Sequence, residues 1–179
     1  MTNPMESELI RLRALEPEDV NILYKWENDT EIWKVSNTVA PFSKHMLRQF
    51  IENQQRDIYE PRQLRLIIES KADGKPGGAI DLFDLDPYNC RAGVGILIYD
   101  QRDQRQGYAS HAVSIVIRYG FQVLNLNQLY CDIPSQNIQS LALFKSKGFS
   151  VIGLKKEWTK TTSDWQGEDM LQLLNPKKW

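Results

Sequence analysis

A donor-rich loop at the start of a helix is the part of the sequence best suited to chemistry. The stretch QRDQRQGYASHA (residues 101–112) brings glutamine and arginine side chains up to Gly107, and a helix begins at about Tyr108. The first N–H groups of a helix have no partner inside it, and the peptide dipoles add positive charge there, so such an end binds phosphates well. Gly107 lets a ligand approach the backbone closely. Because GxxxxGK[ST] and a GxGxxG after a strand are absent, a solvated turn with an ordinary N-cap is the alternative interpretation.

Two aspartates in the apolar segment AIDLFDLD (79–86) are candidates for proton transfer. Asp81 and Asp84 have opposite strand parity, so at most one of them faces a given site. Asp81 interrupts the apolar run, which favours an inward-facing carboxylate that acts as a general base. A solvated or structural aspartate is the alternative for Asp81.

The composition restricts the class of protein. The chain has 179 residues, is 41% hydrophobic and carries a formal net charge of −1, so we expect one soluble domain over 1–179 and no nucleic-acid surface. No signal peptide or membrane-spanning stretch is visible, and a cytoplasmic protein without membrane contact is expected. Cys90 and Cys131 form no CxxC pattern, and His45 and His111 have no ligand spacing, so no metal site is expected.

The hydrophobic pattern predicts the elements that position these residues. Short apolar runs bounded by turn residues predict an antiparallel meander, and the stripe that begins at Ala109 has helical spacing. Gly148 suits a left-handed helix cap. The resulting plan is an α+β fold with some parallel pairing. It has strands over 8–15, 64–70, 79–86, 91–100, 129–133, 149–158 and 168–174, and helices from Pro17, Ser43, Tyr108 and Ile138.

Two sequence blocks resemble the GNAT-type N-acetyltransferases. QRQGYA (104–109) fits the Q/R-x-x-G-x-G/A signature between a strand and a long helix, and Asn137, Ser140 and KSKGF (145–149) fit the family's second block. GGAIDLFDLDPYN resembles the subgroup of spermidine and ribosomal-protein N-terminal acetyltransferases. The resemblance implies an α/β/α sandwich whose mixed, mostly antiparallel sheet contains a splayed parallel strand pair and has flanking helices.

The resemblance further implies acetyl-CoA as co-substrate, with no metal. The loop and helix start would hold the pyrophosphate, the backbone of a splayed strand would pair with the pantetheine arm, and the second block would contact pantetheine or phosphates. By matching positions, the pyrophosphate would be held by Gln104, Arg105, Gln106, Gly107, Tyr108, Ala109 and Ser110. The strand backbone that pairs with pantetheine would be that of Ile96, Leu97 and Ile98, and the second-block contacts would come from Asn137 and Ser140.

Two positions depart from the family pattern. Phe144 stands where many members have the tyrosine that protonates the departing thiolate, and Gly93 stands where related sequences often have a glutamate. Tyr130, Tyr108, water or the amine's own proton could replace the missing acid. Asp81 is the candidate left for the base.

The acceptor pocket of the family is built from the first two helices and the last hairpin. Aromatic faces and negative charge there would suit a cationic amine through cation–π contacts and ion pairing. The candidate residues are Trp26, Glu27, Glu31, Trp33 and Asp169, although core packing and a solvated acidic face are the alternatives.

Three functions follow from these observations. The first is acetylation of a small polyamine such as spermidine or a diamine. The second is acetylation of a protein N-terminus, which a wide groove would favour over a closed acidic pocket. The third is a catalytically silent acyl-CoA-binding module, suggested by Phe144 and Gly93. A homodimer is common among relatives and is a further expectation.

Overall fold

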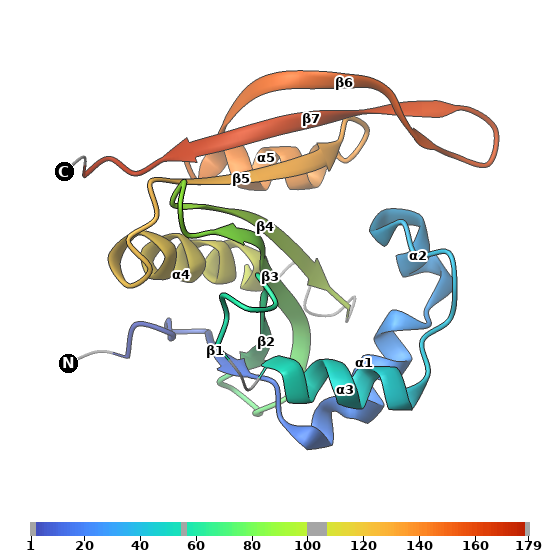
Figure 1. The fold of residues 1–179 in the computed structure, drawn as a ribbon, viewed down its shortest axis with the longest axis vertical. Helices are drawn as coiled ribbons and strands as arrows, with labels where there is room; N and C mark the ends of the chain where they lie inside the picture. Colours follow the sequence, from blue (N-terminus) through green and yellow to red (C-terminus); the bar gives the residue numbers. More distant parts are fainter. Residues whose placement is uncertain (1–2, 55–56, 100–106, 178–179) are drawn as a thin grey trace.

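A computed structural model describes residues 3–54, 57–99 and 107–177 of the chain. A seven-stranded sheet with the order β1-β2-β3-β4-β5-β7-β6 forms its centre (Figure 1). The strands are β1 (Ile10–Ala14), β2 (Leu64–Ser70), β3 (Pro76–Asp86), β4 (Arg91–Ile98), β5 (Gln128–Pro134), β6 (Ser150–Lys160) and β7 (Trp165–Leu174). The helices are η1 (Pro17–Asp19), α1 (Val20–Glu27), α2 (Thr30–Ser36), α3 (Lys44–Gln54), α4 (Tyr108–Gln122) and α5 (Ile138–Ser146).

Helices cover both faces of the sheet, which confirms the expected sandwich. On one face, buried residues of α4 and α5 pack on β1–β5, and Val113 and Val116 of the predicted helical stripe lie among them. On the other face, α1 and α3 pack over Ile67 of β2. Successive residues of a strand point to opposite faces, so the same strands serve both layers.

All strand pairs are antiparallel except β4 with β5. The predicted meander is β2–β3–β4. The parallel pair has only three register positions, from Arg91↔Gln128 to Gly93↔Tyr130, after which the two strands are no longer paired. The mixed sheet and the splayed parallel pair expected from the sequence are therefore confirmed.

One helix was not expected from the sequence. Helix α2 has seven residues and depends on its ends, because the side chain of Asp29 accepts a hydrogen bond from the backbone N–H of Glu31 and Asn37 closes the helix in the left-handed conformation, with φ of 55°. Asparagine tolerates that conformation better than most residues. This helix places Ile32 and Ser36 at the edge of the site.

Candidate active site

The gap between β4 and β5 opens into a cavity of 640 Å³. One wall is formed by Val94–Leu97 of β4, and the other by Cys131–Pro134 of β5. Of the strand residues expected to pair with a ligand, Ile96 and Leu97 line this cavity, whereas Ile98 lies at the end of the strand. Since sheet pairing leaves these edges beyond Gly93, an extended ligand with amide groups can pair with them as a strand would.

Gly107 begins α4 with φ of +83°, a left-handed conformation that glycine adopts without strain. The backbone N–H groups of Tyr108, Ala109 and Ser110 form the first turn and have no partner within the helix. This geometry suits an anion. The expected phosphate ligands Gln104, Arg105 and Gln106 lie outside the described residues.

Tyr108 itself points into the core. Its side chain is buried, and its hydroxyl donates a hydrogen bond to Oγ of Ser70 at 3.2 Å. This hydroxyl is therefore engaged away from the cavity, which disfavours Tyr108 as the replacement acid.

The second sequence block lies at the start of α5. Oδ1 of Asn137 accepts a hydrogen bond from the backbone N–H of Ser140 at 3.1 Å, which makes Asn137 the N-cap, and both residues line the cavity. Phe144 also lines it but is almost completely buried, with its ring packed edge-on against Phe149 at 5.1 Å between centroids. Phe144 therefore serves the core and offers no proton.

A buried ion cluster at the end of α1 forms one part of the cavity wall. Arg65 donates two hydrogen bonds to Asp81, from Nε to Oδ1 and from Nη2 to Oδ2, both at 2.8 Å, and its Nη1 pairs with Oε1 of Glu27. Although burial opposes the charge, these two carboxylates raise the pKa of Arg65 further above its ordinary value. Each carboxylate oxygen has two lone pairs, so both oxygens of Asp81 can accept a further hydrogen bond besides the one from Arg65.

Two aromatic residues, Trp26 of α1 and Tyr99 directly after β4, lie near this cluster. The rings of Trp26 and Tyr99 are stacked, 4.2 Å apart and within 2° of parallel. Trp26 is buried in the core, while Tyr99 packs against that core and lines the cavity. Burial first, and the nearby charge of Glu27 second, raise the pKa of the Tyr99 hydroxyl above its ordinary value, so it stays protonated.

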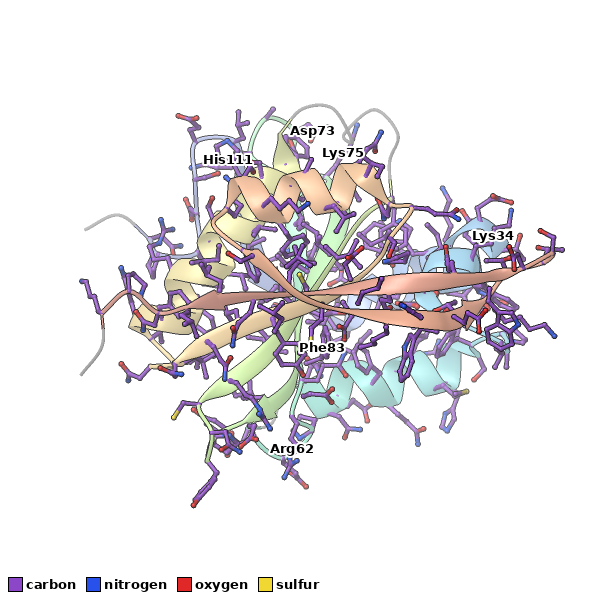
Figure 2. All side chains as sticks on the ribbon, turned by 90° about the horizontal axis from the view of Figure 1, so that it is seen from above. Lys34, Arg62, Asp73, Lys75, Phe83 and His111 are labelled. Carbon is purple, nitrogen blue, oxygen red and sulfur yellow. The ribbon has the colours of Figure 1, made fainter. Side chains whose placement is uncertain are left out.

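The acceptor residues expected from the sequence separate in the structure. Glu27 lines the cavity, but Glu31 is exposed and pairs with Lys34 on the outside of α2. Trp33 is half-buried and its Nε1 donates to the backbone oxygen of Glu27 at 2.6 Å, outside the residues that line the cavity. In Figure 2, Lys34 lies toward one end of the molecule, whereas Phe83 lies near its centre.

A second ion cluster forms the opposite part of the cavity wall. Nζ of Lys155 on β6 lies 2.9 Å from Oδ2 of Asp132 and 3.4 Å from Oε2 of Glu168. Asp132 and Glu168 line the cavity. The sequence indicated Asp169 instead, but neighbouring residues of β7 point to opposite faces, and the cavity face belongs to Glu168.

The ring of Phe83 explains the glycine at position 93. A Cβ atom at Gly93 would lie 2.3 Å from Cε2 and 2.4 Å from Cζ of Phe83, which is far inside van der Waals contact. The ring also packs edge-on against Tyr130, with the centroids 6.1 Å apart. Phe83 thus occupies the space that a glutamate side chain at position 93 would need.

Nucleophilic catalysis by cysteine finds no support in the geometry. Cys131 lines the cavity, but burial raises the pKa of its thiol to about 12, so the thiol stays protonated near neutral pH. Within the described ranges there is no cluster of three or more His, Cys, Asp or Glu residues suited to a metal ion. No helix among the described residues has the length and apolarity needed to cross a membrane.

A parallel strand pair that separates, a long helix packed against both strands and an acidic cavity between them define an enzyme of the acyl-CoA-dependent transferase class. Residues 10–150 match the family described as "Acetyltransferase (GNAT) domain", and the chain belongs to this family. It is an acetyl-CoA-dependent N-acetyltransferase, as the resemblance of its two sequence blocks predicted.

Relatives agree with this assignment. The chain is 26% identical to spermidine N(1)-acetyltransferase of Escherichia coli (strain K12), over 80% of this chain and 74% of the relative. It is 31% identical to an uncharacterized N-acetyltransferase, p20, of Bacillus licheniformis, over 86% of both chains. A spermidine N-acetyltransferase from Vibrio cholerae, in complex with CoA and spermine, has the same fold with a TM-score of 0.84 at 21% identity, over 94% of this chain and 96% of that one.

Proposed function

We propose that the acceptor of this acetyltransferase is a linear polyamine of the spermidine class. The observation that carries the proposal is the charge of the cavity beside β4. Its described lining includes four carboxylates, Glu27, Asp81, Asp132 and Glu168, and one guanidinium, that of Arg65. Negative charge in a partly enclosed site attracts ammonium groups and raises their local concentration.

The reaction requires a neutral amine, which attacks the thioester carbonyl carbon and forms a tetrahedral intermediate with an oxyanion. The carbonyl then re-forms as the carbon–sulfur bond breaks, and the departing thiolate takes a proton. We propose that backbone N–H groups of β4 stabilise the oxyanion and that Asp81 accepts the amine proton, directly or through water. Asp81 lines the cavity, which supports this role, and its bidentate pairing with Arg65 fixes its orientation. The cofactor roles of Gly107, Asn137 and Ser140 follow the family pattern.

Further support comes from the relatives. The Escherichia coli relative is named for spermidine, and it aligns with most of the chain. Acetylation of a protein N-terminus stays the alternative from the sequence, but the recessed acidic cavity favours a small cation over an extended peptide. The expected homodimer stays a prediction.

Thiol release from acetyl-CoA, measured with a panel of amines, tests the proposal. The panel includes spermidine, putrescine and peptides that begin with Ala or Ser. We expect the highest kcat/KM with spermidine and a spermidine KM that rises with ionic strength, because screening weakens attraction to the carboxylates. Turnover confined to the peptides would refute the polyamine proposal.

A further inference from the structure

The ammonium group of Lys155 lies in a small cage at the end of the cavity. Besides Asp132 and Glu168, the ring of Trp158 lies beside it, with Nζ 5.0 Å from the ring centroid. Two carboxylates and an indole face form the surroundings that an alkylammonium ion prefers. The sheet register produces this cage, because Lys155 lies opposite Glu168 on β7 and Asp132 lies on the neighbouring strand β5.

The two carboxylates of the cage contact both the acceptor cavity and Lys155. Asp132 and Glu168 line the cavity, and Lys155 is not among its described lining residues. One carboxylate oxygen, Oδ1 of Asp132, is buried and accepts no hydrogen bond from any described residue. The cage therefore retains an acceptor for a further N–H donor.

The two ion clusters of the cavity differ in how firmly the cation is held. The guanidinium of Arg65 is planar, makes a bidentate bond to Asp81 and is only 17% exposed. Lys155 ends a flexible stem, is 29% exposed and makes one short and one longer contact. An ammonium on such a stem exchanges its partners more easily than a fixed fork does.

We propose that Lys155 is a specificity-determining residue, whose ammonium neutralises part of the Asp132–Glu168 pair and so sets how many positive charges the cavity accepts. This inference rests on the proposed acetylation of polyamines. When Lys155 is present, the cage carries two negative charges and one positive charge. Without it, the same wall carries two negative charges and binds the distal ammonium of a polyamine more strongly.

The substitutions Lys155→Met and Lys156→Met test the inference. Methionine keeps much of the lysine side chain but has no charge. Lys156 is exposed on the same strand, so Lys156→Met removes the same formal charge and is the matched control. Steady-state kinetics with spermidine and with hexylamine are compared for both variants. Calorimetric titration with spermidine adds a binding measurement that does not depend on turnover.

We expect Lys155→Met to lower the spermidine KM and dissociation constant about tenfold, or about 1.4 kcal/mol, because one charge next to the ligand is removed. Hexylamine has no distal ammonium, so its KM is expected to change less than about twofold, as is the spermidine KM of Lys156→Met. The variant Asp132→Asn is expected to raise the spermidine KM, because Lys155 then balances the one remaining carboxylate, Glu168, and the cage has no net negative charge.

Equal effects of the two lysine substitutions, or equal effects on spermidine and hexylamine, would overturn the inference. If the wild-type protein turns over no polyamine, the proposed function fails. Spermidine affinities of the two lysine variants still decide the role of Lys155 in that case, so the two failures are distinguishable.

Discussion

Substitution of Gly93 by alanine tests the packing that replaces the usual glutamate position. The new Cβ would lie 2.3 Å from Cε2 of Phe83, so the ring must move. Overpacking of this kind costs about 1–3 kcal/mol of unfolding free energy. Gly95→Ala is the matched control two residues further along β4, since its Cβ would lie 3.6 Å from the same ring, an ordinary contact.

Urea unfolding of both variants measures the difference. We expect Gly93→Ala to be destabilised and Gly95→Ala to be unchanged or more stable by up to about 1 kcal/mol, because alanine reduces the entropy of the unfolded chain. Phe83→Leu removes the two nearest ring atoms, Cε2 and Cζ, so in that background Gly93→Ala should lose at least about 1 kcal/mol of its cost in a double-mutant cycle. Equal stabilities of the two alanine variants, or an unchanged cost in the Phe83→Leu background, would refute the reasoning.

Two other substitutions test the proposed phosphate site at the start of α4 and the stability of the fold. Gly107→Glu should weaken CoA binding at least about a hundredfold in calorimetry, because a carboxylate at the start of α4 repels phosphate and φ of +83° disfavours a side chain. Asp19→Asn should lower the unfolding free energy at pH 7 by about 1.5–3 kcal/mol, since Asp19 accepts charged hydrogen bonds from Arg13. Burial raises the pKa of Asp19, but Arg13 and the Glu16 N–H outweigh it and lower the pKa below 3.8, so this stability is present above that pH and is lost as the pH falls below it.

Each of these has a control on the same chain. Gly74 also has a positive φ, of +68°, with open space around it, so Gly74→Glu carries the same backbone strain and should leave CoA affinity unchanged. Glu18 is exposed next to Asp19, and Glu18→Gln should change neither the stability nor its acid dependence. Equal CoA affinities of the two glycine variants, or parallel stability curves for wild type and Asp19→Asn between about pH 5 and pH 3, would contradict these predictions.

The fold was largely predictable because its elements have clear periodicity. The strands of the meander, the long helix at Tyr108 and the helix ended by Gly148 all appear close to their expected bounds. Helix α2 escaped prediction because seven residues make barely two turns, too few for a hydrophobic stripe. Its caps, Asp29 and Asn37, were the available signal.

The site was predictable only in part, because ion pairs depend on register between distant segments. Arg65 pairs with Asp81 on the neighbouring strand β3, and with Glu27, which is 38 residues away in the sequence. No local sequence pattern reveals either contact. A charged residue at the start of the apolar run LRLIIES was the same kind of signal that identified Asp81, and it would have identified Arg65. Asp132 interrupts the apolar run LYCDI and carried the same signal, whereas Lys155 gave none, since Lys156 and Glu157 follow it directly.

The short parallel pairing of β4 with β5 divides the sheet into two half-sheets, β1–β4 and β5–β7. Three register positions connect them directly, and beyond those the backbones diverge. A molecule that hydrogen-bonds to both diverging edges therefore acts as a cross-link between the half-sheets. Its binding energy would add to the cohesion of the whole domain, so that the protein gains resistance to heat in proportion to the logarithm of co-substrate concentration.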